Sequence, residues 1–207
     1  IHVTGEGSVA FQDLWVTASS DDAEESNTGS VNLTSPDLDM FIDSGSLPAV
    51  TNQAIGLRFD GVVVPPGATI VDAFVQFQVD EIASEATQIT IHSQAADNAA
   101  TFVAVKQNIT DRARTTPEVT WSPAPWTTVG ITGIEQRTPN LAPLIQAVVN
   151  RPGWASGNAL AFILTGAGQR VGVSFDGNAA PVLHLEYAVL PANSPNQYIY
   201  LPMITRE

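Results

Sequence analysis

The sequence predicts an all-β fold, an antiparallel jelly-roll β-sandwich with one short helix at about residues 140–150. Three observations lead to this fold class. Several segments alternate apolar and polar residues, and because successive side chains of a strand point to opposite faces, this pattern indicates strands with one buried face. Turn-forming proline, glycine and asparagine residues separate these segments, and one later segment has the period of an amphipathic helix. Many short strands joined by such turns are typical of sandwiches and jelly rolls.

Four segments carry the clearest alternation, and they are residues 14–19, 52–59, 69–80 and 87–95. The residues that we expect on their buried faces are Leu14, Val16, Ile55, Leu57, Phe59, Val71, Ala73, Val75, Phe77, Val79, Ile89 and Ile91. The sequence Pro65-Pro66-Gly67 separates two of these strands, because two successive prolines cannot lie inside a central strand. The alternation therefore fixes which face of each strand meets the core.

Other segments are shorter or less regular. Strands are also expected at 31–34, 39–42, 102–105, 119–121, 129–131, 159–164, 170–175 and 181–187. Residues 19–29 are polar, and we interpret them as a loop. Residues 159–164 are apolar on both faces, which is typical of a central strand that is covered on both sides.

One segment has apolar residues at helical spacing, and these are Leu141, Leu144, Ile145, Val148 and Val149. Asn140 precedes this pattern and is expected to cap the helix. Pro143 lies in the first turn, where its missing N–H does no harm. Residues 150–153 contain proline and glycine and should end the helix after two to three turns. The helix is therefore a small addition to a β-sheet protein.

The chain divides into three parts. Residues 1–187 hold all these elements and are predicted to form one sandwich domain. Residues 188–196 contain two prolines and are interpreted as a linker. Residues 197–207 form an apolar, β-prone tail.

Composition excludes several classes of function. The chain of 207 residues has no cysteine, so disulfides and thiolate metal sites are excluded. Its net charge of −13 repels phosphate backbones, so we expect no nucleic-acid partner. No apolar window is long enough for a membrane span. Because the chain begins with Ile1 rather than methionine, we expect that a signal peptide has been removed and that the protein is extracellular or on the cell surface.

The order of the motifs resembles a known group of secreted bacterial jelly-roll modules. The run from Leu57 to Phe77 contains Leu-Arg-Phe, then Pro-Gly-Ala-Thr-Ile, then a strand that ends in phenylalanine. A helix, a Trp154 to Leu160 segment and a final Pro181 to Tyr187 strand follow. This order is similar to that of DNRLRE-type domains and related carbohydrate-binding modules. The resemblance implies a non-catalytic extracellular module, and some relatives bind polysaccharides.

The acidic residues of the first third suggest a cation site. Four carboxylates lie within residues 21–25, and Asp37 and Asp39 follow in the next turn, while Asp176 could approach from a late turn. Hard cations such as Ca²⁺ take six to eight oxygen ligands. We therefore predict a possible structural calcium ion, with Asp21, Asp22, Glu24 and Asp37 as ligands. The alternative is a solvated acidic loop.

Aromatic side chains provide a second kind of candidate site. Sugar rings stack on exposed aromatic faces, and Trp15 and Trp126 are the candidates for such stacking. Trp15 falls on the outer side of its strand, and Trp126 follows a proline-rich loop. In the alternative interpretation the tryptophans cover the edges of the core.

Residues with catalytic potential are few. The histidines, His2, His92 and His184, are far apart, and no Gly-x-Ser-x-Gly motif is present. Without cysteine, a thiol nucleophile is excluded. We therefore expect that the protein is not an enzyme.

The tail decides between the remaining functions. Its apolar side chains are Tyr198, Ile199, Tyr200, Leu201 and Met203. Strand addition to the sheet edge of a neighbouring copy would satisfy such a segment and propagate into a filament. We therefore expect a structural subunit of a surface filament or layer that binds copies of itself by strand complementation. Two alternatives stay open: the tail could fold back on its own domain, and the protein could be a calcium-stabilised carbohydrate-binding module.

Overall fold

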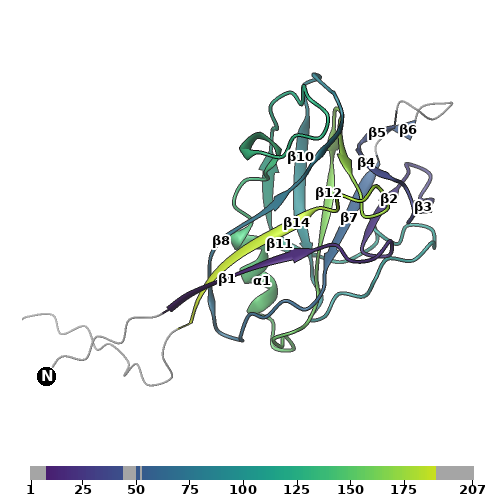
Figure 1. Cartoon of the computed structure of the whole chain (residues 1–207). Coiled ribbons are helices and arrows are strands. Elements are labelled where there is room, and N and C mark those ends of the chain that lie inside the picture. Colours follow the sequence, from purple (N-terminus) through teal and green to yellow (C-terminus); the bar gives the residue numbers. More distant parts are fainter. Residues whose placement is uncertain (1–7, 44–49, 52, 190–207) are drawn as a thin grey trace, which may run out of the picture.

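The structure is a computed structural model that describes residues 8–43, 50–51 and 53–189. These residues form two packed layers of antiparallel strands with one short α-helix, as the sequence predicts (Figure 1). In Figure 1 strands β1, β14 and β8 cross in front of β10, β12 and β7. The fold class is thus confirmed as an all-β sandwich.

Two three-stranded sheets make up the front layer. The first has the order β1-β14-β8 and consists of β1 (Ser8–Trp15), β14 (Val182–Val189) and β8 (Thr69–Gln76). The second has the order β4-β13-β9 and consists of β4 (Asp37–Met40), β13 (Arg170–Val173) and β9 (Val79–Glu81). The chain passes directly from β8 to β9 through Phe77 and Gln78. This short connection links the two front sheets.

One six-stranded sheet makes up the back layer. Its order is β11-β10-β12-β7-β2-β3, with β11 (Arg114–Trp121), β10 (Gln88–Gln94), β12 (Leu160–Ala167), β7 (Ala54–Phe59), β2 (Asp22–Glu25) and β3 (Val31–Asn32). The remaining elements are the β5 (Ile42–Asp43) and β6 (Val50–Thr51) pair, the 3-10 helix η1 (Ile134–Gln136) and α1 (Ala142–Val149). Helix α1 packs against β8, β10 and β11.

Strands from the two halves of the chain pair in nested order. Strand β1 pairs with β14, β4 with β13, and β7 with β12, all antiparallel. Such nesting is typical of a jelly roll, in which the folded chain wraps around the core. As a result, segments 150 or more residues apart in sequence meet beside the groove described below. One example is the hydrogen bond from the Phe175 N–H to the Asp22 carboxylate.

The main core lies between the two layers. It combines inward residues of the front strands, such as Leu14, Val75 and Leu183, with Ile89 and Phe162 of the back sheet. All the other residues predicted to face the core, apart from Val71, are buried as well. The alternation in the sequence therefore predicted the buried faces well.

A β-bulge explains the exception. Glu186 pairs with Asp72, and the next residue Tyr187 pairs with Ile70, so Val71 has no partner of its own. One extra residue in a strand reverses which side chains face the core beyond that point. Ile70 is therefore buried and Val71 is 46% exposed, and the prediction that Val71 faces the core is wrong.

A second apolar cluster covers the other face of the back sheet. Phe102 and Ile109, from the segment between β10 and β11, pack on alanine and isoleucine side chains of β7 and β12. A Cβ on Gly56 would lie 2.4 Å from the Phe102 ring, so the ring rests directly on the backbone of β7. Strand β12 is thus buried on both faces, as predicted for residues 159–164.

Several segments differ from their predicted structure. The strand predicted at 14–19 instead runs from Ser8 to Trp15. Residues 102–105 and 129–131 are turns and loops rather than strands, and of their large apolar residues only Phe102 is buried. The 19–29 segment, predicted as a loop, contains the buried strand β2. Hydrogen bonds from distant parts of the chain hold that acidic strand, and a local sequence pattern does not reveal them.

The helix and the end of the domain lie close to their predicted positions. Helix α1 begins at Ala142, and the Asn140 side chain accepts a hydrogen bond from the Ala142 N–H at 2.8 Å. Strand β14 continues through Ala188 and Val189, two residues that the sequence had assigned to the linker. None of the described helices is long and apolar enough to cross a membrane.

Candidate functional site

A groove of about 620 Å³ opens where the two front sheets separate. Its wall residues come from the end of β1, from the β8–β9 connection and from the loop between β13 and β14. The lining residues are Trp15, Val16, Gln76, Phe77, Gln78, Thr132, Phe175, Asp176, Asn178, Ala179, Ala180 and Val182. Sites for small molecules and short polymers have volumes of roughly 300–1,000 Å³, so this groove has a suitable size.

Strand alternation places Trp15 in the groove. Leu14 and Val16 point into the core, so Trp15 between them points outward and is 56% exposed. Its strand is held by eight pairs of residues with β14, in which Trp15 lies opposite Val182. Beyond it, the Val16 N–H donates to the Pro181 carbonyl at 3.2 Å. The indole therefore stands on a regular strand with both neighbours fixed.

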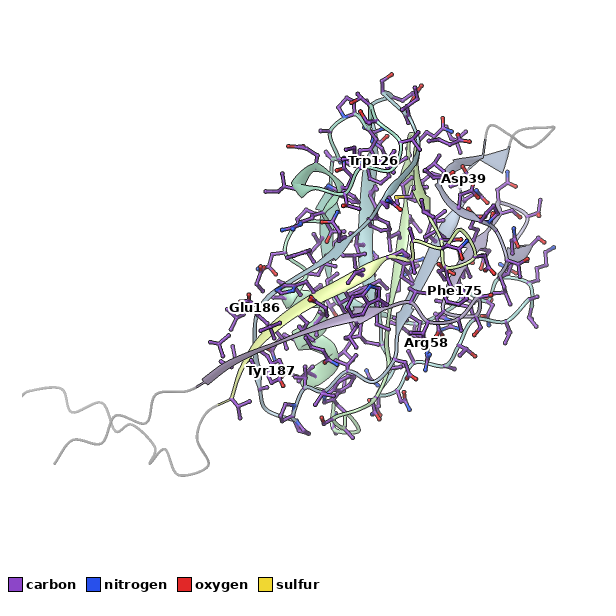
Figure 2. All side chains as sticks on the ribbon, in the orientation of Figure 1. Asp39, Arg58, Trp126, Phe175, Glu186 and Tyr187 are labelled. Carbon is purple, nitrogen blue, oxygen red and sulfur yellow. The ribbon has the colours of Figure 1, made fainter. Side chains whose placement is uncertain are left out.

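The loop between β13 and β14 forms the opposite wall. The Phe175 N–H donates to Asp22 Oδ2 at 2.7 Å, and the Ser19 hydroxyl donates to Asp176 Oδ1 at 3.0 Å. A Cβ on Gly177 would lie 2.0 Å from the Pro36 carbonyl oxygen, so the loop packs tightly on the turn before β4. These contacts hold the wall in place, and Figure 2 marks the position of Phe175 within it.

The groove combines one exposed aromatic face with several polar groups. Gln78, Thr132, Asp176 and Asn178 provide amide, hydroxyl and carboxylate groups, and Asp176 is the one charged residue among the lining residues. Gln78 Nε2 donates to the Gly130 carbonyl, which fixes the direction of its amide. The arrangement can stack a flat apolar ring face and hydrogen-bond to hydroxyl groups around it.

The structure corrects the prediction for Trp126. This side chain is 0% exposed and lies within the sandwich, with its Nε1 hydrogen-bonded to the Glu135 carbonyl (Figure 2). Its ring packs near Phe77 and Trp121. Trp126 therefore belongs to the core and cannot stack on a sugar. The alternative interpretation, in which tryptophans cover the core, holds for Trp126, Trp121 and Trp154 but not for Trp15.

The outer face beside the groove carries a cross-strand stack. The His184 ring lies between Phe74, 4.9 Å away, and Phe11, 6.3 Å away. Its Nδ1 is 2.7 Å from Asp13 Oδ1, and its Nε2 is 3.4 Å from Glu186 Oε1. Burial opposes protonation, but these carboxylates raise the pKa of His184 above its ordinary value. These rings lie against one another, so the stack supports the sheet.

The four predicted cation ligands do not meet at one point. Asp21 forms an ion pair with Arg58 at 2.8 Å, and Asp22 binds the Phe175 N–H. Glu24 and Asp37 do come together, and Asp39 joins them, with carboxylate oxygens within 4.8 Å of one another. Asp37 also belongs to a second group with Asp80 and Glu81. The Asp37 region can therefore offer up to five carboxylates, of which the sequence predicted two as ligands.

Calcium binding stays a prediction with a direct test. Calcium binds oxygens at about 2.3–2.6 Å, and Asp37 lies in both carboxylate groups. We expect millimolar calcium to raise the melting temperature by several degrees, and Asp37→Asn to remove that shift. Asp111→Asn, which makes the same charge change at an exposed residue, should keep it. Equal melting temperatures with calcium and with a chelator would reject the site.

The buried carboxyl group of Asp22 makes stability depend on pH. Burial raises the pKa of Asp22 from 3.8 to about 7, helped by the charges of Asp176 and Asp21 and opposed by the Phe175 hydrogen bond. The native state thus binds this proton more tightly than the unfolded state, and the stabilisation present below pH 3.8 is lost as the pH rises through about 7.

We expect Asp22→Asn to reduce this pH dependence. The amide keeps an oxygen that can accept from the Phe175 N–H but has no proton to lose. The variant should gain about 2.5 kcal/mol relative to the wild type between about pH 5 and pH 8. Urea denaturation at both pH values measures this. The same slope in both proteins would contradict the assignment.

Some predicted residues lie outside the described part of the chain. They are the tail residues Tyr198, Ile199, Tyr200, Leu201 and Met203. The predicted contact between copies therefore stays a prediction. Within the described residues, β1 pairs with β14 along one side, at the edge of its sheet.

The sequence identified only part of the groove. Trp15 was predicted from its position in an alternating strand, and Asp176 was noted only as a possible cation ligand. Gln78, Thr132 and Asn178 carried no signal of their own, because loops far apart in the sequence bring them together. Asn178 has a φ of 69°, a left-handed conformation that asparagine tolerates better than most residues.

A scan against models of known protein families and a search of curated proteins find no match for the chain.

Proposed function

We propose that the protein is a non-catalytic carbohydrate-binding module that holds a glycan in the groove beside Trp15. The observation that carries this proposal is the indole of Trp15, 56% exposed, on the wall of a groove that also presents amide, hydroxyl and carboxylate groups. A pyranose ring has an apolar face of C–H groups and a rim of hydroxyls. The groove offers a matching partner for each.

The walls of the groove are held in place by strand pairing and hydrogen bonds, which favours ligand binding. Trp15 stands on a strand that is paired along its length, and hydrogen bonds from Ser19 and to Asp22 hold the opposite loop. Binding to a preformed site loses less conformational entropy than binding to a flexible one. The proposal agrees with an extracellular location, which the sequence predicts, and needs no catalytic residue.

Replacement of Trp15 by alanine tests the proposal. We expect Trp15→Ala to weaken binding to soluble xylan, β-1,4-glucan or chitin oligosaccharides by about tenfold or more, because a buried aromatic contact typically contributes more than about 1 kcal/mol. Isothermal titration with each oligosaccharide measures the affinity. The wild type should bind at least one of them.

Phe11→Ala is the matched control. Phe11 lies on the same face of β1, is 72% exposed and does not line the groove. Its loss should leave binding unchanged within about twofold. The proposal is wrong if no polysaccharide binds, or if Trp15→Ala and Phe11→Ala weaken binding equally. Self-assembly through the tail, the other predicted function, stays a prediction because its residues lie outside the described part of the chain.

A further inference from the structure

We propose that the groove prefers glycans that carry free amino groups, with the ammonium group of the sugar paired with Asp176. This inference rests on the proposed function and names the ligand class of the same site. It depends on the charge distribution of the groove.

Asp176 supplies a carboxylate without a cationic partner among the lining residues. It is exposed, and no lysine, arginine or histidine lines the groove. Ser19 donates to one of its oxygens, Oδ1, which orients the carboxylate and leaves Oδ2 able to accept from an ammonium group. A hydrogen bond between an ammonium and a carboxylate is about twice as strong as one between neutral groups.

The negative charge of the groove comes from Asp176 and from the net charge of the protein, because Asp22, behind the same wall, has a pKa of about 7 and is mostly protonated where amines are charged. Asp22 binds the backbone of Phe175, next to Asp176, and the charges of Asp176 and Asp21 both act on it. Arg58 neutralises Asp21, but it is itself shared with Asp60. The protein as a whole carries a net charge of −13. The potential in the groove is therefore negative and attracts a cation.

A cation beside the groove, on a residue that contacts the lining residue Gln76, is already engaged. Arg137 donates to Gln76 Oε1 at 2.7 Å and lies over the Phe74 ring at 4.4 Å. It is held on the outer sheet face and does not line the groove. Uronate or sulfated chains would therefore meet Asp176 without a compensating charge and be repelled, whereas neutral chains would bind without electrostatic gain.

Trp15 reinforces the preference for a cationic sugar. An ammonium group near the face of an indole ring gains about 0.5–2 kcal/mol, and tryptophan is the most favourable aromatic residue for this contact. Trp15 and Asp176 line the same groove. An amino sugar can thus stack on the indole while its amine meets the carboxylate.

Two oligosaccharides with the same backbone test this inference. Glucosamine oligomers and N-acetylglucosamine oligomers share their β-1,4 linkage and differ at the amine. At low salt and at a pH where the amines are protonated, we expect the glucosamine oligomer to bind about tenfold more tightly or better. Asp176→Asn should remove this difference and retain binding of the acetylated oligomer. Asp111→Asn, an equal charge change outside the groove, should keep the difference.

The outcomes separate this inference from the proposed function. If both oligomers bind with equal affinity, or if Asp176→Asn keeps the preference, the inference is wrong, while Trp15-dependent binding of the acetylated oligomer would still support the proposed function. If neither these oligomers nor any neutral polysaccharide binds, the proposed function and the inference fail together. A binding preference that disappears in Asp176→Asn, in a variant with an unchanged melting temperature, supports the inference.

Discussion

Replacement of Arg170 by methionine is expected to lower the free energy of unfolding by about 3–5 kcal/mol, one of the two largest effects of a single substitution that we expect. Arg170 lies in β13 and is 1% exposed. Its guanidinium donates to the carbonyl oxygens of Ala124, Glu85, Gln169 and Pro123 and to the Thr87 hydroxyl. Methionine fills similar space but donates nothing, so all five acceptors lose a partner, and the bonds to Thr87 and Pro123 are fully buried.

The melting temperature should fall by roughly 10 °C, as expected for a domain of this size. Arg114→Met is the control, because Arg114 is only partly buried, in β11, and its replacement should change the melting temperature by about 2 °C or less. Equal effects of the two substitutions would show that the Arg170 hydrogen bonds do not stabilise the fold.

Replacement of Glu25 by alanine should also cost about 3–5 kcal/mol. Glu25 is 2% exposed, at the end of β2. Its Oε2 accepts from the Ile109 N–H at 2.7 Å and from the Thr110 N–H at 3.0 Å, and its Oε1 accepts from the Thr110 hydroxyl. Alanine would leave these donors unsatisfied and would loosen the segment that covers the back sheet.

Glu25→Gln separates the loss of charge from the loss of acceptors. Glutamine keeps one acceptor oxygen and should cost roughly half as much as alanine. Chemical denaturation measures both variants. If both variants are as stable as the wild type, the hydrogen bonds from residues 109 and 110 contribute nothing measurable.

Strand β2 shows why the sequence predicted some elements and missed others. Strands such as β7 and β10 carry their burial in their own apolar alternation, so the sequence alone predicts them. Strand β2 has the sequence Asp-Ala-Glu-Glu and is buried along its whole length. Its carboxylates are satisfied by N–H groups of residues 39, 109 and 175, which lie far away in sequence. A local pattern cannot reveal partners that only the folded chain brings together.

The residues of the candidate site could be predicted, or were missed, for the same reason. Trp15 could be predicted as exposed because strand alternation determines its face. Trp126 follows a proline-rich loop, and its burial depends on how that loop packs over Phe77 and Trp121. The cation ligands were predicted from their proximity in sequence. Asp22 and Glu24 do share one face of β2, but different segments lie opposite them, and they accept from the N–H groups of Phe175 and Asp39.

The exposure of Trp15 also permits a direct measurement of the central claim, that a glycan occupies its groove. Of the four tryptophans, Trp121, Trp126 and Trp154 are buried, so a water-soluble quencher should reach Trp15 alone. We expect acrylamide or caesium to quench one exposed component of the fluorescence, and Trp15→Phe to remove that component. A saturating glycan, chitin oligosaccharides first, should protect the component from quenching in proportion to the binding measured by titration. Binding of the oligosaccharide with unchanged quenching of Trp15 would place the ligand elsewhere and contradict the account.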